Sequence, residues 1–166
     1  DKFVFLDDVQ YSKGGWHSKN FIIINKEKYS IKAPTIKSSL STSIKDKLID
    51  IKNNWKIKQV KTISQSYSNY KFIDDLNELL DFFLKLKSHN LSELNIEIIK
   101  FISNRLNIKK NFFYSSEFNL NEKRTYKIVK ILEILNAKEY ISPKGAEKYL
   151  KDDNFEELTK VKLVFN

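Results

Sequence analysis

In Phe3-Val4-Phe5-Leu6-Asp7-Asp8-Val9-Gln10-Tyr11, an apolar run passes directly into two acidic residues. Four consecutive apolar residues predict a buried β-strand, and the polar residues behind them predict the loop at its carboxyl end. In open α/β sheets, ligands bind where the carboxyl ends of strands meet loops. Residues directly behind each predicted strand are therefore the first candidates for function.

Strand and helix patterns alternate along the rest of the chain. A β-branched run at 21–24, a turn at 25–28 and an alternating segment at 29–33 predict a β-hairpin. Apolar residues three or four apart predict helices within 60–70, 73–83, 91–106 and 128–135, and Asn90 with Glu93 forms the capping pattern of the third. Short strands are predicted at 112–114, 140–141 and 161–165, whereas 48–51 fits either a strand or the start of a helix.

This order predicts an α/β fold: a Rossmann-like, mostly parallel sheet flanked by helices, with an antiparallel β-hairpin insertion. The length of 166 residues and the hydrophobic fraction of 41% predict a single globular domain over residues 1–166. Because the chain begins almost directly with a strand, we expect a further N-terminal segment in the whole protein. The lack of a long uncharged apolar stretch or a leader predicts a soluble, cytoplasmic protein.

Composition excludes several kinds of chemistry. The chain has no cysteine and two histidines, which excludes disulfides and thiolate nucleophiles and disfavours an all-histidine metal centre. The net charge of +9 suggests an anionic partner, but Arg105 and Arg124 are the only arginines among 30 basic residues. Arginine is the residue that most often forms hydrogen bonds to phosphates and to the edges of guanine bases. Because arginine is scarce, we expect no nucleic-acid partner and interpret the many lysines as a compositional bias.

The first candidate site follows the opening strand. Neighbouring strand residues face opposite sides, so one of Asp7 and Asp8 is expected to face the site as the catalytic residue. It would act as a base, bind a sugar hydroxyl or hold Mg²⁺, which leaves the cofactor open. The alternative is that both aspartates only cap the loop. Gln10 and Tyr11, directly behind them, are predicted to bind substrate.

The loop at 11–20 has the composition of a binding loop. Trp16 is expected to stack on a ring and Lys19 to meet a phosphate, with Asn20 beside them. The alternative is a surface hairpin whose Trp16 fills the edge of the core. We interpret His17 as a solvated loop histidine.

Two further junctions carry polar side chains behind predicted strands. Ser115 and Ser116 follow the strand at 112–114, where they either cap a helix or bind a phosphate or sugar hydroxyl. Ser142, Lys144 and Gly145 follow the strand at 140–141 and are predicted to bind an anion, although the same residues suit an ordinary turn.

These motifs resemble those of the WbqC-like family, and the resemblance runs in order along nearly the whole chain. It rests most on residues 3–11 with Trp16 and Asn20, then on residues 91–95, Ser115-Ser116 and residues 137–149. The chain departs from the family pattern at Lys19, where arginine is usual, and at Gly145-Ala146, where two glycines are usual. The family's Q-P-x-x-x-P-type motif is absent from the chain.

The resemblance implies a role in bacterial surface-polysaccharide or O-antigen biosynthesis. It implies a transferase that moves a small acyl or aminoacyl group, such as glycyl, onto a sugar, with a sugar or nucleotide-sugar as its small-molecule substrate. Two alternatives remain open, a nucleotidyltransferase-like enzyme and a noncatalytic sugar- or nucleotide-binding partner. A homo-oligomer is also left open.

Overall fold

The computed structural model describes residues 1–166 and has a mixed α/β fold. Two compact units divide the chain, unit 1 at Asp1–Phe112 and unit 2 at Phe113–Asn166. None of the helices has the length and hydropathy of a membrane span.

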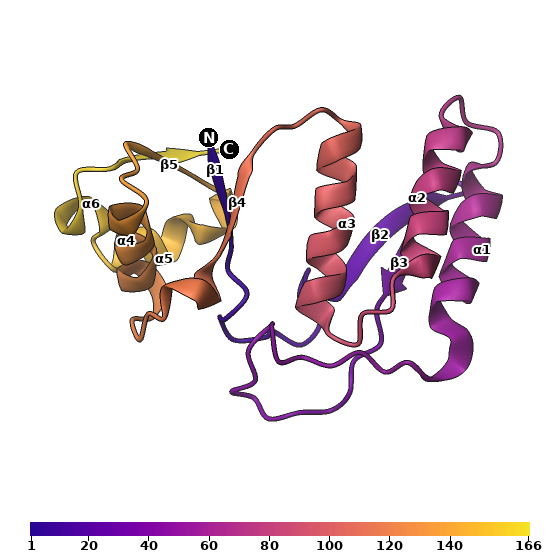
Figure 1. The fold of residues 1–166 in the computed structure, drawn as a ribbon, viewed down its shortest axis with the longest axis horizontal. Coiled ribbons are helices and arrows are strands. Elements are labelled where there is room, and N and C mark those ends of the chain that lie inside the picture. Colours follow the sequence, from indigo (N-terminus) through magenta and orange to yellow (C-terminus); the bar gives the residue numbers. More distant parts are fainter. The chain divides into compact units, whose positions relative to one another are not determined.

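Unit 1 combines two strand pairs with three helices (Figure 1). Its elements are β1 (Lys2–Phe5), β2 (Lys19–Ile24), β3 (Glu27–Lys32), the 3-10 turn η1 (Lys52–Asn54), α1 (Trp55–Tyr67), α2 (Ile73–Lys85) and α3 (Leu91–Arg105). Strand β1 pairs with β4 (Asn111–Tyr114), whose first two residues belong to unit 1. The rings of Phe5 and Phe112 stack with centroids 5.5 Å apart and join these two strands.

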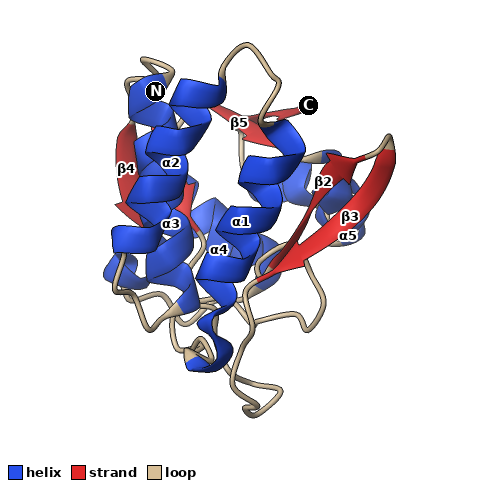
Figure 2. Cartoon of the chain, turned by 90° about the vertical axis from the view of Figure 1, so that its right-hand side faces the viewer, coloured by secondary structure: helices blue, strands red, loops and turns tan.

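The β2–β3 hairpin is antiparallel, with a register that runs from the pair Lys19–Lys32 to the pair Ile24–Glu27. Its turn residues Asn25 and Lys26 both have positive φ, which is the backbone of the tight turns that suit the twist of a hairpin. Helix α1 contacts β2 and also packs on α2, so it stands between the hairpin and the second helix (Figure 2).

The core of unit 1 lies under the first turn of α3. Leu91 and Leu94 are almost completely buried and pack with Ile49, and partly buried rings from Tyr11, Trp55 and Phe83 surround them. The Asn90 side chain accepts a hydrogen bond of 3.1 Å from the amide of Glu93, as the sequence predicts. This cap fixes the start of the helix that carries the core.

Residues 33–51 have no long strand and are organised around Lys47, which is only 4% exposed. Its ammonium donates to the carbonyl of Ile36 at 2.6 Å and to the hydroxyl of Ser38 at 2.7 Å, and lies 4.8 Å from the centre of the Tyr11 ring. These contacts replace the water that a buried cation would otherwise need.

Unit 2 has its own core and one parallel strand pair. Its elements are the second half of β4, η2 (Ser115–Phe118), α4 (Arg124–Ile134), β5 (Glu139–Ser142), η3 (Lys144–Ala146), α5 (Glu147–Asp152), α6 (Phe155–Leu158) and β6 (Lys162–Phe165). Strands β5 and β6 are parallel, with Ser142 opposite Phe165. The buried cluster is formed by Ile128, Val129, Leu132, Ala146, Leu150 and Phe155.

The fold confirms the predicted α/β class and the antiparallel hairpin. A Rossmann-like, mostly parallel sheet is not confirmed: the strands form three separate pairs, β1–β4, β2–β3 and β5–β6. The physical reason is that strand propensity is local, whereas the partner of each strand depends on tertiary packing. The single-domain prediction stays a prediction.

Candidate functional site

A cavity of about 290 Å³ lies in unit 1 beside the β2–β3 hairpin. We call it the hairpin cavity. Its walls come from the end of the 11–20 loop, from both hairpin strands and from α1, α2 and α3. The lining residues are Trp16, His17, Ser18, Lys19, Asn20, Ile31, Lys32, Ala33, Trp55, Gln59, Ile63, Leu79, Leu80, Phe83, Leu94, Asn95 and Ile98.

Hydrogen bonds hold the loop against this cavity from three sides. The Asn95 side chain, on α3, donates to the carbonyl of His17 at 2.8 Å. The amide of Ala33 donates to the carbonyl of Ser18 at 2.8 Å, at the end of the hairpin. The hydroxyls of Ser18 and Tyr11 are 2.9 Å apart and hydrogen-bonded. The loop is thus fixed to α3 and to the hairpin, and the bond between Tyr11 and Ser18 joins its two ends.

Two glycines allow the bend of this loop. Gly14 has a φ of +76°, a backbone conformation that residues with a side chain rarely adopt. A Cβ on Gly15 would lie 3.1 Å from the carbonyl oxygen of Ser12 and 3.4 Å from Nδ1 of His17. The absence of a side chain at Gly15 therefore lets the His17 ring pack under the loop.

His17 is partly buried, which makes the interpretation as a solvated histidine wrong. Its Nδ1 is inaccessible and has no hydrogen-bond partner, and the ring lies 6.1 Å from that of Tyr11. Burial lowers the pKa of His17 below its ordinary value, because the charged imidazolium loses water there. The lowered pKa keeps His17 mostly in its neutral form at pH 7.

Both tryptophans of the chain line the hairpin cavity. Trp16 is 75% exposed, so it does not fill the core edge, and its ring meets the Phe21 ring edge-on at 5.9 Å. Trp55 is partly buried and meets the Phe83 ring edge-on. The cavity thus has one solvent-facing tryptophan and one partly buried tryptophan.

Lys19 and Lys32 lie opposite each other on the two hairpin strands and line the same cavity. The Lys19 ammonium lies 4.9 Å from the centre of the Phe21 ring, and neither lysine forms an ion pair. Like charges on directly opposed strand residues repel each other. An anion at this end of the hairpin would relieve that repulsion.

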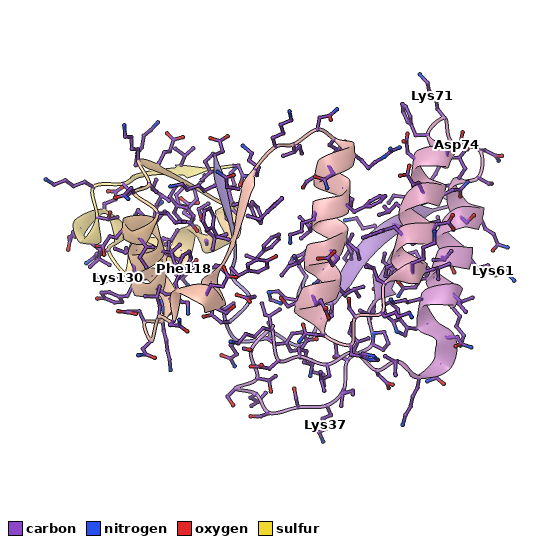
Figure 3. The ribbon with its side chains drawn as sticks, viewed as in Figure 1. Lys37, Lys61, Lys71, Asp74, Phe118 and Lys130 are labelled. Atoms are coloured by element: carbon purple, nitrogen blue, oxygen red, sulfur yellow. The ribbon has the colours of Figure 1, made fainter.

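Lysines elsewhere in unit 1 do not belong to this cavity. Lys37, Lys61 and Lys71 come from three different segments and point outward from the ribbon (Figure 3). This spread fits the interpretation of the net charge as a compositional bias.

The cavity brings together Trp16, Lys19 and Asn20 of the predicted site, but its lining does not include Asp7 or Asp8. Asp7 is 8% exposed and Asp8 is partly buried. The carbonyl of Asp7 accepts from the amide of Lys45 at 2.7 Å, which ties this segment to the next loop. Neither aspartate belongs to a group of three or more side chains that could hold a metal ion.

Gln10 and Tyr11 also have contacts within the protein. The Gln10 side-chain amide donates to the carbonyl of Leu40 at 2.7 Å. Tyr11 packs against the buried Ile49, Leu91 and Leu94. Neither residue lines the hairpin cavity, so their predicted contact with substrate stays a prediction.

The remaining predicted residues lie in unit 2. Ser115 and Ser142 are fully buried at the ends of β4 and β5, and the hydroxyl of Ser142 has no partner. Lys144 and Gly145 are exposed, and a Cβ on Gly145 would meet nothing within 4 Å. Ser116 is partly buried in η2. The geometry at Gly145 does not require glycine.

The sequence interpretation missed Asn95 and His17 as cavity residues. One signal for Asn95 was available, because it shares a helix face with Leu91, Leu94 and Ile98, where a polar residue interrupts the apolar stripe. The burial of His17 carries no local signal, because it results from α3 and the hairpin folding against the loop.

The chain is similar to a curated protein and matches the model of a protein family. The uncharacterized protein Rv1507c of Mycobacterium tuberculosis is 26% identical over 161 residues, which are 96% of this chain and 69% of that protein. No solved structure matches. The model of the WbqC-like protein family matches residues 1–166, and the chain therefore belongs to the WbqC-like protein family.

Proposed function

We propose that this protein is a transferase of surface-glycan biosynthesis that moves a small acyl or aminoacyl group onto a nucleotide-linked or lipid-linked sugar in the cytoplasm. The observation that carries the proposal is the hairpin cavity, whose lining includes Trp16, Lys19 and Asn20 of the predicted binding loop. An aromatic ring beside a lysine pair is suited to a ligand with both an apolar and an anionic part. Membership of the WbqC-like family supports the pathway.

The proposed reaction is a direct transfer. The acceptor hydroxyl oxygen forms a bond to the acyl carbonyl carbon, and the bond from that carbon to the donor's leaving group breaks. The leaving group takes the electron pair, and the hydroxyl proton passes to a base. With no cysteine in the chain, no thiol intermediate within it takes part.

Two groups are candidates for the base. Asp7 or Asp8 is the prediction made from the sequence. His17 is mostly neutral at pH 7 because its pKa is lowered by burial, and it lines the cavity. Within unit 1, Gln10 and Tyr11 keep their predicted roles in substrate binding. In unit 2, the roles predicted for Ser116, Lys144, Gly145 and the buried Ser115 and Ser142 stay predictions and are not used in this proposal.

A transfer assay on the full-length protein tests the function. Acyl and aminoacyl donors are incubated with nucleotide sugars, and mass spectrometry detects a sugar product heavier by the acyl group. We expect a product with the natural protein and a loss of at least tenfold in rate with Trp16→Ala. Asp7→Asn, Asp8→Asn and His17→Gln, tested singly, identify the base, and full activity in all three would refute this site.

A second function is favoured by one observation, the absence of both aspartates from the cavity lining. It is the noncatalytic binding of a sugar or nucleotide by a partner in an assembly complex. In that case a ligand would raise the melting temperature of the protein without turnover. Pyrophosphate release from a nucleoside triphosphate would instead identify a nucleotidyltransferase.

A further inference from the structure

The polar side chains of the hairpin cavity are largely engaged with the protein itself. Asn95 donates to the carbonyl of His17, and Gln59 donates to the carbonyl of Lys32. The Ser18 hydroxyl is bonded to that of Tyr11, and the Asn20 side chain accepts from the amide of Phe21 at 2.8 Å. These side chains fix the walls, and they leave few partners for the hydroxyls of a sugar.

Most of the remaining wall is apolar, apart from His17, Lys19 and Lys32. Aliphatic side chains come from all three helices, including Ile63, Leu79 and Ile98, and the rings of Trp55 and Phe83 close one side. A polar group that enters such a space loses its water without a full set of new hydrogen bonds, which is unfavourable. An aliphatic chain gains free energy in the same space.

The size of the cavity limits what it holds. Pockets for whole drug-sized ligands span about 300–1,000 Å³, and an apolar cavity of about 150 Å³ binds benzene. At about 290 Å³, the hairpin cavity has room for one small group such as a short acyl chain. The bulk of a larger ligand would lie outside it.

The mouth of the cavity carries positive charge. Lys19 and Lys32 are opposed across the hairpin without an ion pair, and both belong to the lining. A phosphate near both ammonium groups would remove their mutual repulsion.

The geometry points to an acyl donor with an aliphatic acyl group, held in the hairpin cavity, and an anionic carrier that faces Lys19 and Lys32. This inference rests on the proposed transferase function and narrows its substrate class. A glycyl group is excluded from the cavity because its ammonium would be stripped of water in an apolar space.

A chain-length series tests the inference by intrinsic fluorescence, since both tryptophans of the protein line the cavity. The probes are coenzyme A and its acetyl, butanoyl and hexanoyl thioesters. Each buried methylene is worth about 0.8 kcal/mol, so we expect Kd to fall about fourfold for each added methylene until the cavity is full. A Kd that does not depend on chain length would overturn the inference.

Two variants of α3 provide a matched pair. Ile98→Phe fills the cavity and is expected to abolish the dependence on chain length. Ile102→Phe, one turn further along the helix, adds the same ring at an exposed position outside the lining and is expected to leave it unchanged. Far-UV circular dichroism checks that both variants fold. The chain-length series on the natural protein tests the inference even if a variant does not fold.

The lysines are tested separately from the apolar wall. Lys19→Ala and Lys32→Ala are each expected to raise the Kd for hexanoyl-coenzyme A at least threefold. The Kd for hexanoyl-pantetheine, which has no phosphate, should stay unchanged. Lys28→Ala, on the same strand as Lys32 but outside the lining, is the control. Equal effects on both probes would overturn the role of the lysines.

Different results would overturn the proposed transferase function and the proposed aliphatic acyl donor. Glycyl transfer to a sugar without a chain-length dependence would overturn the aliphatic donor and keep the transferase. A chain-length dependence without any transfer to a sugar would overturn the transferase and keep the acyl-binding cavity. Binding of glycinamide or a nucleotide sugar that Ile98→Phe abolishes would also overturn the inference.

Discussion

His17 combines an inaccessible Nδ1 with a position in the wall of the hairpin cavity. Because burial lowers the pKa of His17 in the folded state, the unfolded chain binds a proton there at a higher pH than the folded chain does. The stability that the neutral ring provides is therefore complete above about pH 6.5. It is lost as the pH falls from there through the folded-state pKa.

We expect the urea midpoint of the natural protein, followed by tryptophan fluorescence, to fall between pH 7 and pH 5. The fall should be smaller in His17→Gln, because glutamine does not titrate. An equal fall in both proteins would contradict the conclusion that protonation of His17 causes this loss of stability. In the His89→Gln background, the remaining histidine signal in an NMR titration should have its midpoint below about 6.5.

Asn95 is the side chain that ties α3 to the binding loop. Asn95→Ala removes the bond to the His17 carbonyl at 2.8 Å, and we expect the free energy of unfolding to fall by about 1–2 kcal/mol. Asn104→Ala, an exposed change on the same helix, should alter it by less than about 0.5 kcal/mol. Urea denaturation measures both, and similar values for the two variants would contradict the role of Asn95.

Helix α3 shows what a local pattern is able to predict. Its cap at Asn90 and its apolar stripe through Leu91 and Leu94 depend on neighbouring residues, and both appear in the structure. The hairpin was predictable for the same reason, since its turn and strands are contiguous. The hairpin cavity was not, because its walls come from five elements that meet only in the folded chain.

The cap of α3 also has a partner outside the helix, because the Asn90 side chain donates to the carbonyl of Lys45. Asn90→Ala loses both bonds, and we expect a loss of about 1–2 kcal/mol in the free energy of unfolding. Asn90→Asp keeps the acceptor for the Glu93 amide and loses only the donor. Its loss should be clearly smaller in the same urea titration, and an equal loss would show that the cap contributes little.

At the scale of the whole molecule, the α/β class followed from the sequence but the sheet did not. Each predicted strand from β1 to β6 is present, yet each pairs with a single partner. Periodicity identifies strands, whereas the order of strands in a sheet depends on contacts between distant residues. For the same reason the sequence placed Trp16 and Lys19 in one candidate loop but did not reveal the cavity that both residues line.

The net charge of +9 leads to a prediction for the whole protein. With two arginines, we expect only nonspecific binding to a labelled 20-nucleotide DNA, with a Kd no tighter than about 10⁻⁶ M at physiological salt. Fluorescence anisotropy at several salt concentrations measures it. A Kd far below this value that differs between DNA sequences would contradict the interpretation of the lysines.

Photocrosslinking with a hexanoyl-coenzyme A that carries a diazirine at the end of its acyl chain tests whether the hairpin cavity holds the acyl group. Mass spectrometry of the digested protein locates the label. The hairpin cavity predicts labelled residues within 16–33, 55–63, 79–83 and 94–98, and a loss of this label in Ile98→Phe but not in Ile102→Phe. Label concentrated outside these segments, or undiminished in Ile98→Phe, would contradict the acyl-binding cavity.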